Sequence, residues 1–169
     1  MLKRSDQLQD ITVASLHTGR DIDVVGAIVL NPFDLSVAGF HLTEDPGKIL
    51  LVSDIREIGA GQFIVDSSDV IAEEGDLLRL KDVLKLNYQL VGKQVRSKSG
   101  QKLGHVKDYV IDDVSWKVQK LHVKQPIWKS LTEATLIIDR RQVIEVNDHS
   151  VTVEDTTLRA GKLAPQQTV

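Results

Sequence analysis

The sequence contains an internal repeat, and this repeat restricts the fold more than any other feature of the chain. Residues 19–42 align with residues 100–123 at a constant offset of 81, over 24 positions and without a gap. Most core-like positions stay apolar in both copies, which makes a chance match a poor explanation. The repeat therefore predicts one small module that is present twice. The five identities are Gly19/Gly100, Val25/Val106, Val29/Val110, Val37/Val118 and His41/His122.

The second half of each copy matches more loosely. The run Leu50-Leu-Val-Ser-Asp resembles Leu136-Ile-Ile-Asp-Arg, and each run is followed by a second short apolar segment. Those segments are Gln62-Phe-Ile-Val-Asp and Ser150-Val-Thr-Val-Glu. The offset drifts by a few residues here, as an insertion in a loop would produce.

The apolar pattern within each copy favours short strands. From Val118 to Val123 the residues alternate, with Leu121 and Val123 on one face and Lys120 and His122 on the other. Phe40 and Leu42 repeat this phase, with His41 facing away. Aromatic residues make up only 4% of the chain, so Val, Ile and Leu must build the core, and branched residues favour strands. We therefore predict an all-β protein with two small β-barrels in tandem.

Four segments follow from this interpretation. Residues 10–72 form the first copy and residues 90–157 the second. Residues 73–89 between them place leucines at helical spacing and predict a short helical linker. The polar residues 158–169 are expected to be a disordered tail. Barrels this small bury modest cores, so contact between them, or with another subunit in a homo-oligomer, is expected to add stability.

One segment of the second copy resembles the PRC-barrel family, which is named after a β-barrel of the H subunit of photosynthetic reaction centres. The resemblance rests on Gly92 with Val95, followed by Gly100, Leu103, Gly104, Val106 and Asp112. The first copy is a diverged version, with Asp23 in place of the second glycine and Asn31 in place of the final aspartate. Members of this family share protein–protein contact and no common catalytic residues. The resemblance thus implies a binding module, and a fold alone does not specify which partner it binds.

The residue types that usually carry catalysis form no recognisable constellation. The chain has no cysteine, and its five histidines are not at metal-ligand spacing. His41 and His122 hold the same place in the two copies and are interpreted as tolerated surface residues. The adjacent Asp112 and Asp113 are expected to serve a turn rather than a metal. No phosphate-binding or dinucleotide-binding glycine motif is present. We therefore expect no enzymatic activity, no metal and no cofactor.

The charge is distributed unevenly. Residues 1–90 carry 8 basic and 15 acidic side chains, whereas residues 91–130 carry 9 basic and 3 acidic ones. A concentrated positive surface attracts phosphates or an acidic protein, and neighbouring aromatic rings suit an interface. Four interpretations stay open: a solvated face, an acidic protein partner, nucleic acid, and contact with the acidic first copy. The predicted partner-binding residues are Lys93, Arg96, Lys98, Lys102, Lys107, Lys117, Lys120, Lys124, Trp116 and Trp128.

The apolar runs are far shorter than the roughly 20 residues that cross a bilayer, so no transmembrane segment is predicted. The absence of cysteine suits a reducing compartment, and we expect a cytoplasmic protein. The leading hypothesis is a non-catalytic adaptor that binds another macromolecule through its barrel surfaces, with a protein as the expected partner. One alternative is an RNA- or ribosome-associated assembly factor that uses the basic face of the second copy. The other is a peripheral membrane-associated scaffold.

Overall fold

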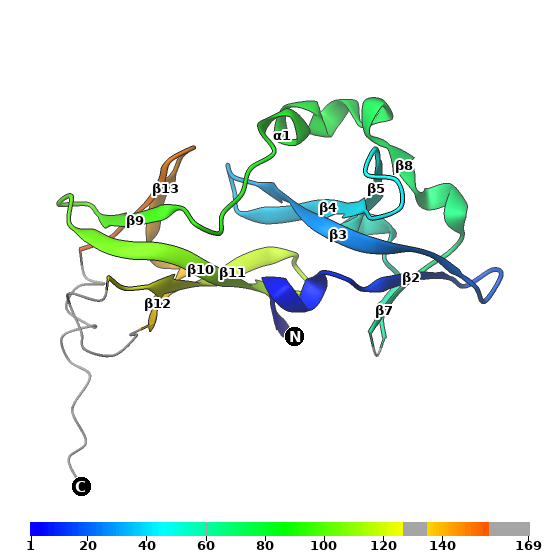
Figure 1. Cartoon of the computed structure of the whole chain (residues 1–169), viewed down its shortest axis with the longest axis horizontal. Coiled ribbons are helices and arrows are strands. Elements are labelled where there is room, and N and C mark those ends of the chain that lie inside the picture. The colour runs from blue at the N-terminus through cyan, green and yellow to red at the C-terminus, as the bar shows by residue number, and fades with distance from the viewer. Residues whose placement is uncertain (60, 127–134, 156–169) are drawn as a thin grey trace, which may run out of the picture. The chain divides into compact units, whose positions relative to one another are not determined.

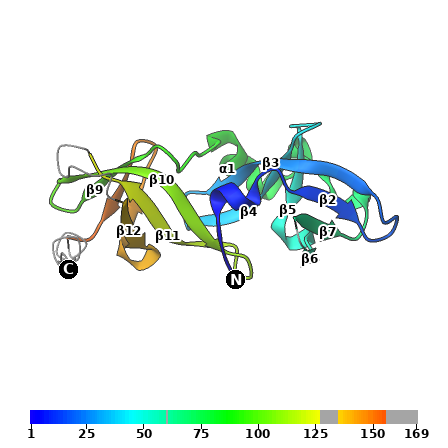
Figure 2. The same ribbon diagram turned by 60° about the horizontal axis from the view of Figure 1, so that its bottom comes forward.

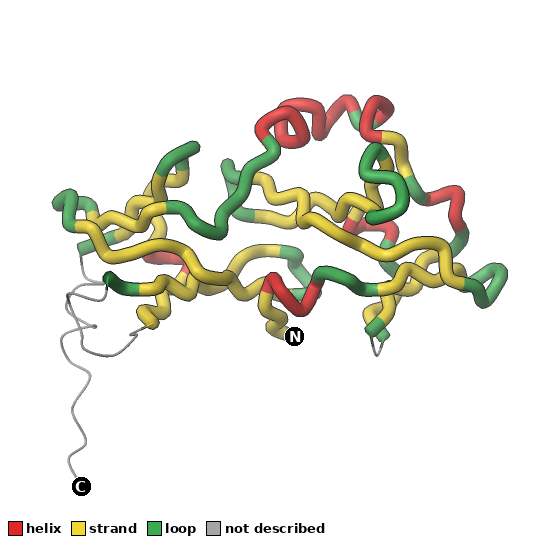
Figure 3. The backbone as a smooth tube through the Cα atoms, viewed as in Figure 1, coloured by secondary structure: helices red, strands yellow, loops and turns green. Residues whose placement is uncertain are grey.

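The computed structural model describes residues 1–59, 61–126 and 135–155, and the segment predicted as a disordered tail lies outside them. Strands dominate these ranges, as Figure 3 shows in yellow. The one α-helix among the described residues, α1 (Lys81–Leu86), is 6 residues long. The prediction of an all-β chain with one short helix is thereby confirmed.

The chain divides into two compact units, and the division does not follow the sequence in a simple way. Unit 1 consists of Met1–Tyr88 together with Ile111–Lys117. Unit 2 consists of Gln89–Val110 and the residues from Val118 onward. The short stretch Ile111–Lys117 therefore belongs to unit 1, although both of its flanking segments belong to unit 2.

The strands of unit 1 form one hydrogen-bonded path in the order β8-β5-β4-β3-β2-β7-β6 (Figures 1 and 2). All of its neighbouring pairs are antiparallel except β2 with β7, which is parallel. A further strand, β1 (Leu2–Arg4), pairs with β10 (Lys102–Asp112). The path comprises β2 (Thr12–Ser15), β3 (Asp21–Asn31), β4 (Ser36–Leu42), β5 (Lys48–Leu51), β6 (Glu57–Ile58), β7 (Gln62–Val65) and β8 (Ala72–Glu73).

The strands of unit 2 follow the order β12-β11-β10-β9-β14-β13. In the part of the chain that the structure describes, neither this path nor that of unit 1 joins its two ends, so the sheet is open. The strands are β9 (Gln94–Ser97), β10 (Lys102–Asp112), β11 (Lys117–Lys124), β12 (Thr135–Asp139), β13 (Val143–Val146) and β14 (Ser150–Val153).

The two paths repeat the same strand pairings. The parallel pair β2–β7 sets Val13 against Phe63, and the parallel pair β9–β14 sets Val95 against Val151. A register irregularity follows Val13 in β2 opposite β3, and β10 has its own irregularity between Lys102 and Gly104 opposite β9. In each unit a 3₁₀ turn also follows the strand that pairs with the long hairpin, which is β3–β4 in unit 1 and β10–β11 in unit 2. Val52–Asp54 follows β5, and Arg140–Gln142 follows β12.

The pairings correct one detail of the sequence alignment. Phe40 pairs with Leu50 in unit 1, and Leu121 pairs with Ile138 in unit 2. Leu50 therefore corresponds to Ile138, whereas the sequence comparison set it against Leu136. The error is two residues, and a shift of two leaves every side chain of a strand on its original face.

The buried side chains agree with the predicted alternation. Phe40 and Leu42 are buried in unit 1, and Leu121 and Val123 are buried in unit 2. The histidine between each pair is only partly covered. Unit 1 adds an aromatic contact to its core, because the ring of Phe40 lies 5.1 Å from that of Phe63 between centroids.

Helix α1 covers the outer side of the unit 1 sheet. Its Val83 and Leu84 pack on Val29 of β3 and Ile49 of β5, and all four side chains are buried. The helix ends at Asn87, whose left-handed backbone, with φ at 43°, donates its N–H to the Leu84 carbonyl. The predicted linker 73–89 therefore holds part of β8, two 3₁₀ turns and α1.

The turns of the two long hairpins share an unusual backbone. Leu35 and Trp116 occupy corresponding places, and both have φ at 54°, which non-glycine residues seldom adopt. Leu35 is fully buried. The Trp116 ring lies edge-on to Phe40 and Phe63, at centroid distances of 5.8 and 6.2 Å. Residues 111–117 thus complete the core of unit 1.

Candidate interaction face

Half of the ten predicted partner-binding residues lie on the outer side of β9, β10 and β11 in unit 2. In β9 the exposed Arg96 stands between the buried Val95 and Ser97. In β10 the exposed Lys107 follows the buried Val106. Successive side chains of a strand point to opposite faces, so these cations point away from the core.

The hairpin of β9 and β10 concentrates charge at its end. Arg96 and Lys102 are directly opposite each other in the antiparallel ladder, and Lys98 lies in the connecting turn. Like charges in this position destabilise a strand pair by a fraction of a kcal/mol, on the order of 0.2–1. The Arg96 guanidinium donates two hydrogen bonds to the Gln94 side-chain oxygen, at 2.8 and 2.6 Å, which holds it on this face.

A second group of cations continues across β11. Lys120 and Lys124 are exposed at alternating positions that leave Leu121 and Val123 inside. Gly104 connects the two groups, because a Cβ atom there would collide with the Lys124 carbonyl oxygen. The start of β10 and the end of β11 therefore touch at the backbone, so Lys124 lies next to the strand that carries Lys102 and Lys107.

Among the described residues, Asp108, Asp139 and Asp155 are the acidic groups that lie beside these cations. Asp139 lies opposite Lys120, and its carboxylate accepts a hydrogen bond from the Arg141 guanidinium at 2.9 Å. This bond, together with the Arg141 backbone N–H, lowers the pKa of Asp139. Asp108 lies beside His122, with 4.0 Å between its carboxylate oxygen and the ring Nδ1. Asp155 lies beside Lys98 at the hairpin turn, where the Ser99 hydroxyl and N–H donate to its carboxylate, each at 3.0 Å. The cations of this surface still outnumber these three carboxylates.

The corresponding places in unit 1 carry no cation. The strand pairing that sets Arg96 against Lys102 in unit 2 sets Ala14 against Asp21 in unit 1. The fold therefore does not require basic side chains at these positions. The residues of unit 1 that correspond, in this order, to Arg96, Lys102, Lys107, Lys120 and Lys124 are Ala14, Asp21, Gly26, Gly39 and Thr43.

The remaining predicted residues are placed differently. Lys93 is half-buried, and its ammonium donates to the Asp148 carbonyl at 2.5 Å. Lys117 is exposed but belongs to unit 1, where it pairs with Ser36. Trp116 is half-buried, and its ring packs on Phe40 and Phe63. Trp128 lies outside the described residues.

At the second hairpin turn the carboxylate of Asp112 bonds the turn itself, as expected, whereas that of Asp113 contacts the amino group of Met1. Asp112 accepts hydrogen bonds from the Ser115 hydroxyl at 2.7 Å and from its backbone N–H at 3.1 Å. These bonds lower the pKa of Asp112. The amino group of Met1 pairs with both Asp112 and Asp113. Among the described residues no three His, Asp or Glu side chains are grouped as a metal site.

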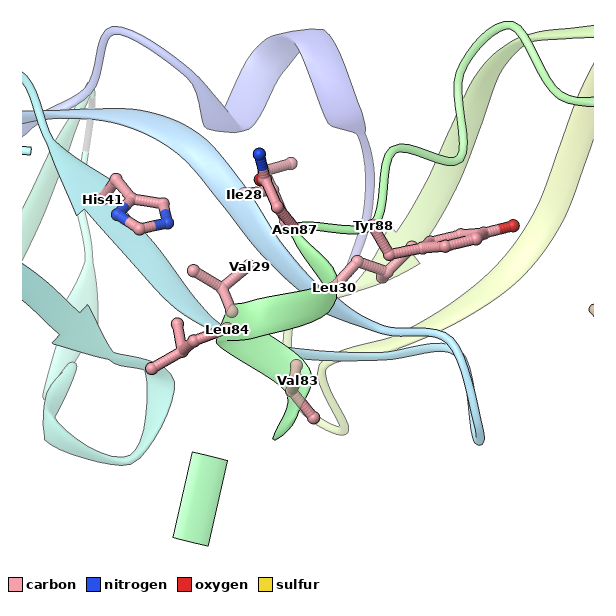
Figure 4. Close-up of a pocket in the computed structure, with 8 residues that line it drawn as sticks. All are labelled: Ile28, Val29, Leu30, His41, Val83, Leu84, Asn87 and Tyr88. Atoms are coloured by element: carbon pink, nitrogen blue, oxygen red, sulfur yellow. The ribbon is translucent and has the colours of Figure 1, made fainter. Parts of the chain in front are cut away.

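Two of the hollows in unit 1 were not indicated by the sequence. One is a cavity of about 10 Å³ under α1, lined mainly by apolar side chains with His41 and Asn87 (Figure 4). The His41 ring nitrogen lies 3.0 Å from the Pro46 carbonyl oxygen. The volume is enough for about one water molecule, so the cavity is too small for a substrate.

The other hollow is an open groove of about 440 Å³ with Asp23, Glu44, Asp45 and Glu73 around Lys48. Asp23 is buried, and one of its oxygens accepts from the N–H groups of Val24 and Glu44 and from the Thr43 hydroxyl. The signal in the sequence was the replacement of the expected glycine by Asp23, whose carboxylate makes these bonds next to the groove. The Lys48 ammonium is within 4.0 Å of both Asp45 and Glu73, so the acidic groove is partly neutralised from within.

None of the helices in the described part of the chain has the length and apolar character needed to span a bilayer. No family model matches the chain, and no curated protein is significantly similar to it in sequence.

Proposed function

We propose that this chain is a non-catalytic, cytoplasmic interaction module that binds an anionic surface of another macromolecule. The contact is made by the outer cationic surface of unit 2, formed by Arg96, Lys98, Lys102, Lys107, Lys120 and Lys124. In this proposal the two units are copies of one module of the PRC-barrel type. The repeated strand registers and the shared left-handed turn residue support that ancestry.

One observation carries the proposal. The cations occupy places where the same strand pairing tolerates alanine, aspartate, glycine and threonine. Two of them, Arg96 and Lys102, face each other at a small cost in stability. Cations that the fold does not require at these places are best explained by what they bind.

Protein is favoured over nucleic acid as the partner. Proteins that bind single-stranded nucleic acid combine cations with aromatic rings on which bases stack. Trp116, the described tryptophan near the basic residues, packs edge-on against Phe40 and Phe63 instead. The chain as a whole is also acidic, with a net charge of −3. An acidic protein surface requires only the cations.

The test is a comparison of charge reversals on the two units. The double variant Lys107→Glu/Lys120→Glu removes the centre of the cationic surface, and Lys81→Glu/Lys85→Glu makes an equal change on the exposed side of α1. Each immobilised protein is exposed to an extract of its native organism at low and moderate salt, and retained molecules are identified by mass spectrometry.

We expect one set of acidic partners to be retained by the natural chain and by the α1 variant. The unit 2 variant and moderate salt should both release that set, because screening weakens contacts between exposed charges. Retention of the same partners by the unit 2 variant would refute the proposal. Retention dominated by RNA would replace the acidic protein with nucleic acid.

A further inference from the structure

In each unit one further strand pairs with the long hairpin, and the two units differ in what covers the outer side of this strand. In unit 1 this strand is β5, and in unit 2 it is β12. His41 pairs with Ile49 of β5, and His122 pairs with Ile137 of β12. The two isoleucines therefore hold the same place. Ile49 is 0% exposed and Ile137 is 58% exposed.

Unit 1 covers this place with one continuous segment of its own chain. Residues 72 and 73 form β8, which extends the sheet beyond β5 by pairing Ala72 with Ile49 and Glu73 with Lys48. The chain then turns back as α1, whose Val83 and Leu84 bury Ile49 from above. An acidic extended stretch followed by an amphipathic helix is thus what completes this sheet.

Unit 2 lacks a counterpart to this segment among the described residues. There β12 has a single hydrogen-bonded neighbour, β11, so its other edge is unpaired within those residues. The outer side of β11 and β12 is formed by Lys120, His122, Lys124, Ile137 and Asp139, which we call the β11–β12 face. Exposed strand edges and exposed apolar side chains are the features by which sheets accept a further strand.

We propose that the β11–β12 face receives an acidic amphipathic segment of a partner protein. The segment extends the sheet at the edge of β12 and continues as a short helix over Ile137, as residues 72–86 do in unit 1. This inference rests on the proposed function and names the kind of partner that the cationic surface binds.

The chemistry of the face specifies the segment. Where Ala38 and Leu51 lie under α1 in unit 1, unit 2 has Gln119 and Asp139. The helix therefore needs fewer apolar residues than α1 has, with one placed over Ile137. Lys120 and Lys124 flank that position and favour carboxylates on the segment, while Asp139 is already bonded to Arg141. Residues 158–169 fit poorly as the occupant, because their charged side chains are Arg159 and Lys162.

The experiment uses the full chain and a labelled peptide that copies residues 70–88 with Arg79→Glu, Lys81→Glu and Lys85→Glu. Binding is followed by fluorescence anisotropy at low ionic strength, against a scrambled peptide of the same composition and a single-stranded RNA oligonucleotide. The key variant is Ile137→Thr, which keeps a β-branched residue in an exposed strand position. Ile144→Thr on β13 is the matched control, since Ile144 is also exposed, at 46%.

We expect the acidic peptide to bind more tightly than its scrambled form. Ile137→Thr should weaken binding by about tenfold or more, because burial of an isoleucine on the face is lost, and Ile144→Thr should leave it unchanged. Bound peptide should also protect backbone amides of β12 from hydrogen exchange, which reports pairing at the edge.

Other results would overturn the inference. Equal binding of the scrambled peptide, equal effects of the two isoleucine variants, or unprotected β12 amides each exclude a segment on this face. Peptide binding that requires removal of residues 158–169 would make the chain its own occupant, and self-association that depends on Ile137 would make a second copy the occupant. Binding of RNA without peptide, lost in Arg96→Glu, would leave an anionic partner in place and remove this inference alone. Binding of neither probe would remove both.

Discussion

The inner and outer sides of the two units have diverged to different extents. Inside, an apolar pair faces the core at the same place in both units: Phe40 with Leu50, and Leu121 with Ile138. Outside, one of the pairs changes from Gly39 with Leu51 to Lys120 with Asp139. The core side must stay apolar, because burying a polar group there without a hydrogen bond costs free energy. The outer side is where the two units can acquire separate tasks.

This difference follows from what each outer side contacts. In unit 1 the outer side is a second small core, because α1 lies on it. In unit 2 the same side carries exposed lysines and an exposed isoleucine. The same sheet can therefore be covered by a segment of its own chain or stay exposed. Apolar residues on the outer side accompany the covered sheet, and charged residues accompany the exposed one.

The sharpest test of the comparison exchanges the two corresponding isoleucines for alanine. Ile49→Ala should cost about 2–5 kcal/mol of unfolding free energy, since it leaves a cavity beneath α1. Ile137→Ala should change it by less than about 0.5 kcal/mol, as is usual for surface sites. Urea unfolding of both variants measures the difference. Similar costs would mean that Ile137 is covered in solution.

The second prediction concerns the close approach at Gly104. Its φ is +146°, and a Cβ atom at this position would collide with the Lys124 carbonyl oxygen, so there is no room for a side chain. Gly104→Ala should therefore cost about 2–3 kcal/mol, from backbone strain and from separation of the two strands.

Unit 1 provides the counterpart, because Asp23 replaces this glycine and bonds Thr43 and Glu44 on the neighbouring segment. Asp23→Ala should cost about 1–2 kcal/mol through the loss of those bonds. Chemical denaturation again gives both values. An Asp23→Ala change that destabilises more than Gly104→Ala would reverse our account of this position.

A smaller effect is expected at the hairpin turns, where Trp116 corresponds to Leu35. Trp116→Leu gives the second turn the residue of the first and removes the edge contacts with Phe40 and Phe63. The expected loss is about 0.5–1.5 kcal/mol, the usual contribution of aromatic pairs beyond buried area. Val114→Ala in the same turn is the control, because Val114 is 81% exposed and should be neutral. Equal thermal unfolding midpoints for the natural chain and Trp116→Leu would contradict the packing role.

The smallest predicted effect is a dependence on pH at the same turn. Hydrogen bonds from Ser115 lower the pKa of Asp112 in the folded chain, relative to about 3.9 when unfolded. The ionised carboxylate therefore stabilises the fold above pH ~4, and this contribution is lost as pH falls through the lowered pKa. Asp112→Asn, which copies Asn31 of unit 1, should flatten the acid side of the stability profile. Thermal unfolding between about pH 2 and pH 6 tests this, and an unchanged profile would argue against it.

Local patterns were sufficient to predict the central strands and their faces, but not β1 or β8. The alternation around Leu121 and Phe40 identified the buried positions, because one side of each strand must be apolar. The same periodicity could not detect the two-residue error between Leu50 and Ile138, since a shift of two preserves every face. Register there is set by pairing with Phe40 and Leu121, which is a contact between distant parts of the chain.

The cationic surface could be predicted only in part, because a local pattern shows which residues are exposed but not how strands are paired. The exposure of Lys107 and Lys120 followed from strand phase, and both residues lie on neighbouring strands. The direct opposition of Arg96 and Lys102 depends on the irregular register of β9 with β10, which no local pattern encodes. Trp116 packs on Phe63, which lies more than 50 residues earlier in the sequence. No local pattern shows a contact over that separation, so the sequence could not predict how this ring packs.

The discontinuity of unit 1 has a consequence for how the protein is made. During synthesis from the N-terminus, residues 1–88 leave the ribosome well before Ile111–Lys117, which belong to the same unit. Until Trp116 has emerged, the aromatic side of Phe40 and Phe63 lacks its third ring, and Ser36 lacks its partner Lys117. Contacts between residues so far apart in sequence also form slowly. The first unit therefore cannot be completed until Lys117 has emerged, and a chain that stops at Tyr88 should emerge as an incompletely folded, aggregation-prone intermediate.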